Sequence, residues 1–342
     1  MRVSRRGFAG LAAGGLAAIS LPAAADQVLT YGEELQGPAP IPASERGLPT
    51  VIAEPWFKVS DQPLQLEGPV FDRAGNLYFV EVFGGSVFKL TPDKQLTTIL
   101  GPNKMASAGL AIHKDGRIFI AGLGNFSNTG SIVAINPDGS GMKTIIGPDK
   151  GFSIDDLIFD AQGGLYFTDF KGSSTQPTGG LYYLSPDFKK IAVIDPNLGI
   201  ANGVGLSPNG KRLYVTESAK GLLHTIDLAG PTAIAPFGEG VAHKFSGPLP
   251  DSLRVDGDGN VWVALYGQGR YLIFNKNGFP IGQVLLPGRD EGHFLRSTSL
   301  AFKPGTRDVH LVSNDADGDP VQGATIFHCQ GFATALPLFS SQ

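Results

Sequence analysis

Hydrophobic and polar residues recur in one pattern along the chain: an apolar residue, a polar pair, a glycine, then alternating aliphatic and aromatic residues. The first copy runs from Phe71 to Phe79 and reads FDRAGNLYF. Five further copies begin at Ile112, Phe159, Leu206, Val255 and Phe302, and the last of them is the weakest. Asp or Asn beside glycine supplies the positive φ of a tight turn, and alternating apolar residues are typical of half-buried strands. Each copy therefore predicts a β-hairpin.

The spacing of these hairpins predicts the fold. Equivalent positions lie 41 to 49 residues apart, and strand-like runs such as Tyr271–Phe274 and Gln283–Leu286 lie between the hairpins. A repeat of this length with about four strands is the signature of a β-propeller blade. No helical apolar period persists over a dozen residues of the mature chain, which argues against parallel α/β folds. We therefore predict an all-β, six-bladed β-propeller with four antiparallel strands per blade.

A closed ring needs a strand that joins its two ends. The run Val51–Glu54 occupies the place where every other repeat has its outermost strand, so we expect this N-terminal strand to complete the sixth blade. Residues 46–342 would then form one propeller domain. Residues 26–45 are rich in Pro, Ala and Gly, and we expect a leader that packs poorly or not at all.

The N-terminus predicts export. Ser4-Arg5-Arg6-Gly7-Phe8 precedes a short Ala- and Gly-rich apolar stretch that ends in Ala23-Ala24-Ala25. Paired arginines, an apolar core and an A-x-A site together indicate a twin-arginine signal peptide over residues 1–25. We expect the twin-arginine export machinery to carry a mature protein, free of the membrane, to the periplasm or the medium.

Charge and cysteine content exclude several classes of partner and site. Loss of Arg2, Arg5 and Arg6 with the signal leaves 24 basic against 31 acidic residues, so the mature net charge is −7. Nucleic acids and anionic membranes are therefore unfavourable partners. The single cysteine, Cys329, can form neither an intramolecular disulfide nor a thiolate metal cluster. No G-x-S-x-G elbow of a serine hydrolase occurs.

The repeat also predicts a site. The residue five positions before the first member of each turn pair falls at the entrance to each innermost strand, and such positions converge on the axis of a propeller. In chain order they are Glu67, Ala108, Asp155, Asn202, Asp251 and Thr298. Three carboxylates without a cation would repel one another, and burial would add to that cost. Oxygen donors without histidine or thiolate favour calcium, or else magnesium or manganese, over zinc or copper, with zinc as a less favoured alternative ion.

The same residues could instead cap strand entrances by hydrogen-bonding to turn backbone, as Asp and Asn often do. That reading is adequate for any one of them taken alone. Four oxygen-bearing side chains at one phase of the repeat favour the metal site on the central axis.

Longer runs of sequence carry a family resemblance. Leu66-Glu67-Gly68, Ile154-Asp155-Asp156, Ala201-Asn202-Gly203 and Pro250-Asp251-Ser252 resemble the gluconolactonase, regucalcin and luciferin-regenerating propellers. The runs Tyr166–Phe170, Ala264–Arg270 and Pro287–His293 resemble most closely the drug-responsive lactonase branch. The resemblance covers nearly all of the mature chain.

The resemblance implies a divalent ion held by Glu67, Asp155, Asn202 and Asp251, with Ser252 nearby. It also implies that Asp251 is the acid/base residue. Asp156 and Asp169 are further acids that could assist it.

Two further regions bear on the site. Relatives in the drug-responsive branch hold a second, structural calcium between the second and third blades, but here the region Asn128 to Phe152 is one residue shorter and Asp149 is out of register. The loop that carries Arg289, Asp290, Glu291 and His293 lies on the expected metal face. It could shape the pocket or form a surface ion-pair cluster.

Taken together, the residues and the resemblance predict an exported, calcium-type lactonase that opens a small lactone with metal-activated water. One rival is a non-catalytic propeller that binds a sugar acid or a protein, which the fold alone permits equally well. Another is a quinone-dependent sugar dehydrogenase, for which we find no cofactor-binding His/Arg cluster.

Overall fold

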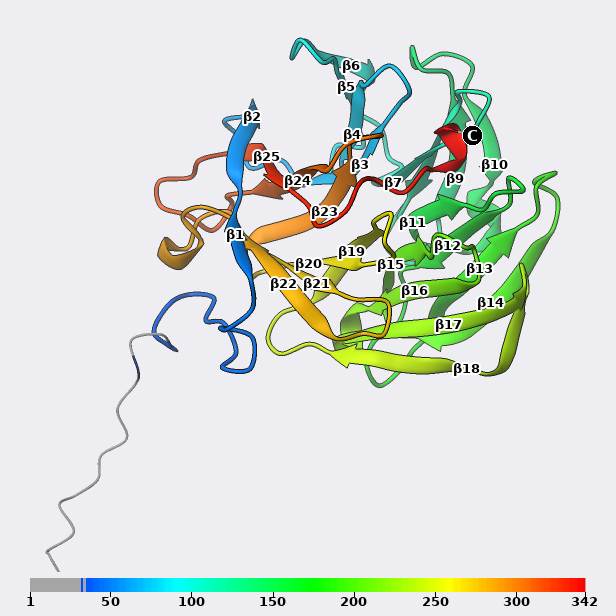
Figure 1. Cartoon of the computed structure of the whole chain (residues 1–342). Helices are drawn as coiled ribbons and strands as arrows, with labels where there is room; N and C mark the ends of the chain where they lie inside the picture. Colours follow the sequence, from blue (N-terminus) through cyan, green and yellow to red (C-terminus); the bar gives the residue numbers. More distant parts are fainter. Residues whose placement is uncertain (1–31, 33–34, 342) are drawn as a thin grey trace, which may run out of the picture.

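The predicted six-bladed β-propeller is confirmed. The computed structural model describes residue 32 and residues 35–341 (Figure 1). The predicted signal peptide, residues 1–25, and most of the first half of the predicted leader lie outside the described residues. Six sheets are arranged around a central axis, and each contributes its first strand to the wall of the central tunnel.

The strands follow one another from the axis outward within each blade. Blade 1 consists of β3 (Leu66–Phe71), β4 (Leu77–Glu81), β5 (Val87–Leu90) and β6 (Leu96–Leu100), and blade 2 of β7 (Ser107–Ile112), β8 (Ile118–Gly122), β9 (Ser131–Ile135) and β10 (Lys143–Ile146). Blade 3 consists of β11 (Ile154–Phe159), β12 (Leu165–Asp169), β13 (Gly179–Leu184) and β14 (Ile191–Leu198), and blade 4 of β15 (Ala201–Leu206), β16 (Arg212–Glu217), β17 (Leu222–Gly230) and β18 (Ala233–Lys244).

Blades 5 and 6 complete the ring. Blade 5 contains β19 (Pro250–Val255), β20 (Val261–Leu265), β21 (Arg270–Phe274) and β22 (Pro280–Leu285), and blade 6 contains β23 (Arg296–Phe302), β24 (Asp308–Asn314) and β25 (Ala324–Gln330). Short 3-10 turns include Pro148–Lys150, Ser218–Lys220, Arg289–Glu291 and Phe339–Ser341. None of the helices in the described part of the chain has the length and hydropathy needed to span a bilayer.

The turn glycines explain why each repeat folds as a hairpin. Gly75, the glycine of the first copy, has φ +82°, and the equivalent glycine has a positive φ in each of the other five copies. In the first copy the Asp72 carboxylate accepts hydrogen bonds from the N–H groups of Ala74 and Asn76. This side chain therefore replaces backbone partners that the turn cannot supply.

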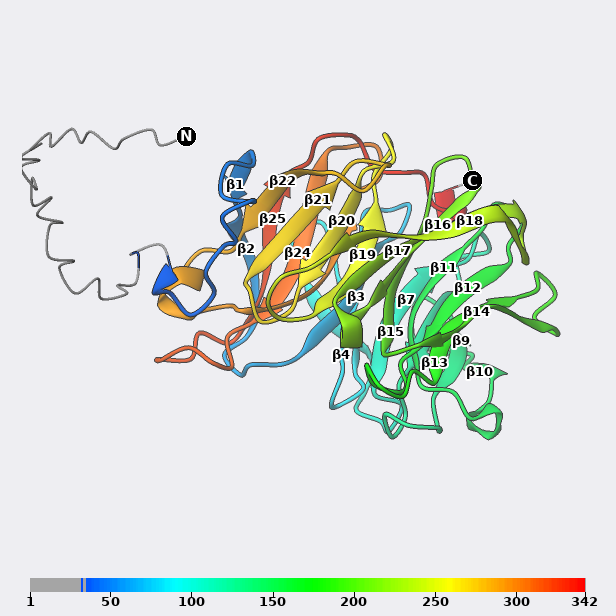
Figure 2. The ribbon, with the colours of Figure 1, turned by 90° about the horizontal axis from the view of Figure 1, so that it is seen from below.

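The ring is closed by the N-terminal segment, but not by the predicted residues alone. β2 (Glu54–Ser60) pairs antiparallel with β25 and is the outermost strand of blade 6. Val51 and Ile52 belong instead to β1 (Thr50–Ile52), which pairs parallel with β22 of blade 5 (Figures 1 and 2). The predicted strand Val51–Glu54 was therefore misplaced by a few residues, because the chain passes from one blade edge to the next at the buried Ala53.

The expectation that residues 26–45 pack poorly is wrong at the C-terminal end of that segment. Ala39 and Glu45 are buried, and the Glu45 carboxylate lies 2.7 Å from the guanidinium of Arg270, which is fully buried in blade 5. Removal of one partner from such a pair leaves a buried charge uncompensated, which typically costs about 3–5 kcal/mol. This part of the segment is therefore integrated into the propeller.

The hydrophobic core fills the spaces between neighbouring blades. One cluster joins Val70 and Tyr78 of blade 1 to Leu110 and Ile118 of blade 2, and similar clusters join the other blades. The two inner strands of each blade are almost entirely buried, whereas the outer strands are mostly exposed. The core therefore holds the innermost strands rigidly around the axis, where the candidate site lies.

Candidate functional site

The six positions singled out by the repeat lie near the start of the six innermost strands. Five of them are the second residue of their strand, and Thr298 is the third residue of β23. Strand pairing is irregular just after each of these positions, as between Glu67 and Val70 in β3 and between Pro250 and Leu253 in β19. Such irregularities re-aim side chains. The repeat therefore gives all six blades the same local geometry at the axis.

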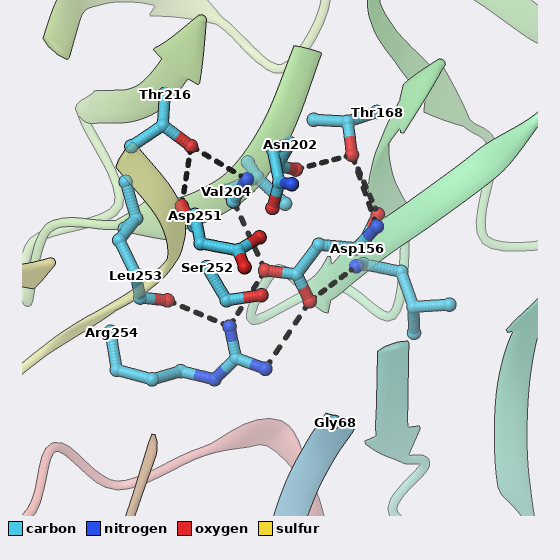
Figure 3. A network of polar contacts seen from close by, with 12 residues as sticks. Gly68, Asp156, Thr168, Asn202, Val204, Thr216, Asp251, Ser252, Leu253 and Arg254 are labelled. Carbon is cyan, nitrogen blue, oxygen red and sulfur yellow. Dashed lines mark hydrogen bonds and ion pairs between the residues drawn. The ribbon is translucent and has the colours of Figure 1, made fainter. Parts of the chain in front are cut away.

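The structure brings together the side chains of blades 1, 3, 4 and 5. Asn202 lies close enough to Asp251 to lower the pKa of its carboxyl, and the charges on Glu67 and Asp155 raise that pKa. The Ser252 hydroxyl donates to Glu67 Oε2 over 3.4 Å. Figure 3 shows Asn202, Asp251 and Ser252 facing a common space. We call Glu67, Asp155, Asn202, Asp251 and Ser252 the axial cluster.

The remaining two positions do not contribute donors to the axial cluster. Ala108 has no polar side chain, and the Thr298 hydroxyl donates to the Leu66 carbonyl 2.7 Å away. The axial cluster therefore takes its side chains from blades 1, 3, 4 and 5, and blades 2 and 6 contribute none.

Burial and mutual repulsion shift the acids of the axial cluster strongly. Burial raises the pKa of Glu67 to about 8, and the charge on Asp156 adds to the increase. Burial, then the neighbouring carboxylates, also raise the pKa values of Asp155 and Asp251 well above the usual range. The buried Asn202 Oδ1 has no hydrogen-bond partner. The three acids therefore lack a positive charge that would stabilise their ionised forms. The Asn202 amide oxygen lacks a hydrogen-bond donor.

A hard divalent cation fits this donor set, because it would pair with the carboxylates and take the free amide oxygen as a ligand. Among residues 32 and 35–341, no three His, Cys, Asp or Glu side chains are already spaced as ligands of one ion.

Asp251 differs from the other ligand candidates in its exposure. Glu67, Asp155 and Asn202 are buried, whereas Asp251 remains partly exposed. Its backbone carbonyl accepts a hydrogen bond from Thr216 Oγ1, which fixes the main chain at this position. Asp251 is thus the carboxylate of the cluster that a water molecule or a substrate can reach most easily.

An ion pair that the sequence did not predict lies directly beside the axial cluster. Arg254 donates from Nη1 to Asp156 Oδ2 over 2.7 Å and from Nη2 to Asp156 Oδ1 over 3.2 Å. The Asp156 carboxylate also accepts from the N–H groups of Leu157 and Val204 (Figure 3). Asp156 is therefore fully hydrogen-bonded and does not serve as a free base.

One feature of the repeat indicates that Arg254 has a partner inside the tunnel. It occupies the position three residues after Asp251, and the equivalents in the other blades are Val70, Ala111, Ile158, Gly205 and Ala301. A charged residue at an otherwise apolar phase of a repeat indicates a partner within the tunnel. Its partner, 98 residues away, could not be read from local sequence.

Several other predicted residues have structural partners. Asp169 is fully buried, accepts a hydrogen bond from the Ser153 N–H, and lies 2.9 Å from the Lys171 ammonium. Asp149, the candidate for a second calcium, is 71% exposed and lies 3.3 Å from Lys150 Nζ.

The loop Arg289–His293 has mixed roles. Arg289 is buried and donates to the backbone carbonyls of Gln268 and Ala39, so it anchors the N-terminal segment. Asp290 and Glu291 are exposed. His293 Nδ1 lies 2.8 Å from the buried Asp315 carboxylate. The loop is thus held mainly by structural contacts.

The raised pKa values predict how stability depends on pH in cation-free protein. An acid whose pKa is higher in the folded state stabilises the fold at low pH, and that contribution is lost as pH rises through the folded pKa, about 8 for Glu67. With chelator present, we expect the free energy of unfolding to fall between pH 5 and pH 9. The slope should be about 1.4 kcal/mol per pH unit for each proton that the folded chain binds and the unfolded chain has lost.

Urea unfolding at several pH values measures this slope. A saturating concentration of calcium chloride should flatten it, because a bound cation replaces the protons. An identical slope with and without calcium would contradict the electrostatic account of the axial cluster.

Comparison with known proteins places the chain among relatives over most of its length. A model of the SMP-30/gluconolactonase/LRE-like region matches residues 66–308. Lactonase drp35 of Staphylococcus saprophyticus is 50% identical over 311 residues, which cover 90% of this chain and 95% of that protein. Lactonase drp35 of Staphylococcus aureus is 45% identical over 318 residues, covering 92% and 97%.

Solved structures share the fold at low sequence identity. A luciferin-regenerating enzyme superposes with a TM-score of 0.68 at 21% identity, covering 83% of this chain and 98% of that one. Regucalcin from Agrobacterium tumefaciens, described as a calcium-binding protein, superposes with a TM-score of 0.66 at 18% identity, covering 84% and 98%.

Proposed function

Because the chain belongs to the SMP-30/gluconolactonase/LRE-like family and is a lactone-hydrolysing enzyme, we propose that it opens a small lactone at the axial cluster with the aid of a divalent cation, calcium in particular. One observation carries the proposal: buried acids with raised pKa values, from blades 1, 3 and 5, face a buried amide oxygen that has no partner. The similarity to a staphylococcal lactonase and to a calcium-binding regucalcin supports it.

Within this proposal, Glu67, Asp155, Asn202 and Asp251 would hold the cation, with Ser252 beside them. When bound, the cation would polarise the lactone carbonyl and stabilise the negative charge that develops on its oxygen. The buried acids would remain ionised only in that state, so the protein supplies the negative charge that selects a hard ion.

Asp251 is the residue we assign to proton transfer. As the oxygen of water bonds to the carbonyl carbon, the carboxylate of Asp251 takes a proton from that water. The bond between the carbonyl carbon and the ring oxygen then breaks, and Asp251 returns the proton to the ring oxygen. The product is a hydroxy acid, and Asp251 ends the cycle ionised. Its partial exposure suits this role.

A substrate panel tests the reaction class. We expect the mature protein to hydrolyse aldonolactones or dihydrocoumarin-type aromatic lactones, and to act far more slowly on the acyclic ester of the same acid. Absence of turnover on every lactone would favour the rival reading, a propeller that binds sugar acids or proteins. Reduction of a dye in the presence of a sugar and added quinone would instead indicate the dehydrogenase.

We also propose export by the twin-arginine route, on the basis of Ser4-Arg5-Arg6-Gly7-Phe8 and the following A-x-A site. Replacement of Arg5 and Arg6 by lysine should remove the mature form from the periplasm. Soluble, active precursor should accumulate in the cytoplasm, because this route carries folded cargo. Undiminished mature protein outside the cytoplasm would show that the signal assignment is wrong. Immunoblots of the separated compartments measure this distribution.

A further inference from the structure

A cavity occupies the end of the central tunnel opposite the axial cluster. It has a volume of about 590 Å³, within the range of small-ligand sites. The axial cluster lies at the start of the innermost strands, whereas this cavity is lined by their last residues, such as Val70, Ile112 and Phe159. We call it the turn-side chamber, because the six predicted hairpin turns lie at this end.

The Asp156–Arg254 pair lies between the axial cluster and the turn-side chamber. The Asp156 charge raises the pKa values of Glu67, Asp155 and Asp251, so it is near the axial cluster. Arg254 lines the turn-side chamber. The pair joins blades 3 and 5 across the backbone of Val204 in blade 4. An ion pair thus separates the acids of the axial cluster from the turn-side chamber.

The C-terminal segment closes the chamber on the other side. Residues 334–341 line it, and in Figure 1 the red C-terminal segment runs across the middle of the ring. Thr334 accepts a hydrogen bond from the Gly257 N–H at 2.8 Å, and the buried Phe339 ring packs on Phe159 and His113. We call residues 334–341 the C-terminal strap. The C-terminal strap therefore covers part of the chamber.

The chamber is largely apolar, with Arg254 at its inner end and Thr334, Ser340 and Ser341 on the C-terminal strap. Among the described residues that line it, Arg254 is the sole titratable group. A guanidinium has five N–H donors. Three of those on Arg254 are used, two by Asp156 and one by the carbonyl of Leu253. The side chain keeps 13% of its accessible surface. Two N–H donors therefore remain for a hydrogen-bond acceptor, beside an apolar wall.

The charges around Arg254 determine which kind of hydrogen-bond acceptor the chamber can bind. Asp156 already neutralises Arg254, and the axial acids lie just beyond it. An anion entering the chamber would lose its hydration without meeting an uncompensated cation. A neutral oxygen would satisfy the free donors without that cost. We propose that the turn-side chamber binds a small, neutral, largely apolar molecule with one acceptor oxygen, such as a ketone or an ester, whose oxygen accepts from Arg254.

Calorimetric titration of the mature protein with 2-nonanone tests this site. We expect saturable 1:1 binding, and binding at least tenfold weaker for nonanoate, which has a similar chain but carries a charge. Ile158→Trp would fill the chamber and should weaken 2-nonanone binding at least tenfold. Ile191→Trp, on the exposed outer strand of blade 3, is the matched control and should bind like the wild type.

The same titration in chelator, and in Asp251→Asn, separates this site from the axial cluster. The inference does not rest on the proposed function, so 2-nonanone binding should be unchanged in both. Absence of binding to the wild type, equal binding of nonanoate, or loss of binding on chelation would each overturn the proposal. If Ile158→Trp does not fold, judged by circular dichroism, Ala301→Leu serves in its place. Undiminished binding in a folded chamber-filling variant would likewise overturn it.

Discussion

Asp251→Asn is expected to lower lactone turnover by about 10³-fold while leaving the affinity for an unreacted lactone analogue within a few-fold of the wild type. The substitution keeps the size of the side chain but removes a group that can accept a proton from water. Asp251 is the partly exposed acid of the axial cluster, and its main chain is fixed by Thr216, so the change should be local.

Because Asp251 is also a proposed ligand of the cation, the measurement must separate the two roles. Steady-state turnover is therefore measured over a range of calcium concentrations, with cation binding followed by calorimetry. Thr298→Ser is the matched control, since Thr298 occupies the same phase of the repeat and its hydroxyl bond to Leu66 is retained. If high calcium restores wild-type turnover to Asp251→Asn, Asp251 acts only as a ligand and not in proton transfer.

Removal of divalent cations should abolish turnover altogether, and addition of calcium should restore it. Without a cation, burial and repulsion raise the pKa values of the axial acids, that of Glu67 to about 8, and so favour their protonated forms. Asp251 is then a poor base, and no positive charge is available for the developing oxyanion. A protonated cluster is therefore inactive for two separate reasons.

Exhaustive dialysis against chelator, followed by assays with added calcium, magnesium or manganese, measures this effect. The melting temperature should rise with calcium, because a ligand at 100 times its Kd stabilises the folded state by about 2.7 kcal/mol. Turnover that survives exhaustive chelation would mean that the reaction does not use a cation at this site.

The sequence predicted the repeated features well, because a propeller converts repeat phase into position in space. Asp72 and Gly75 identified the first hairpin turn, and the structure has that turn with Gly75 at positive φ. The same phase relation predicted that Glu67 and Asp251, far apart in the chain, meet at the axis.

Features that occur once in the chain could not be predicted in this way. The Asp156–Arg254 pair joins blades 3 and 5, and neither residue has a charged equivalent in most other blades. The Glu45–Arg270 pair anchors a segment whose composition suggested a loose leader. The C-terminal strap follows the last repeat and has no counterpart within it. Such contacts depend on three-dimensional proximity alone.

The closure of blade 6 by β2 has a consequence for biosynthesis. Pro55 leaves the ribosome well before its pairing partner, Phe327, which lies 272 residues later in the chain. At 5–20 residues per second, about 14 to 54 s pass between the synthesis of β2 and that of its partner strand. During that interval its Trp56 and Phe57 side chains lack the contacts of blade 6. Pro55 has no backbone N–H to donate, and Lys58 carries a charge. Both therefore disfavour pairing of the unpaired β2 strand with a neighbouring nascent chain.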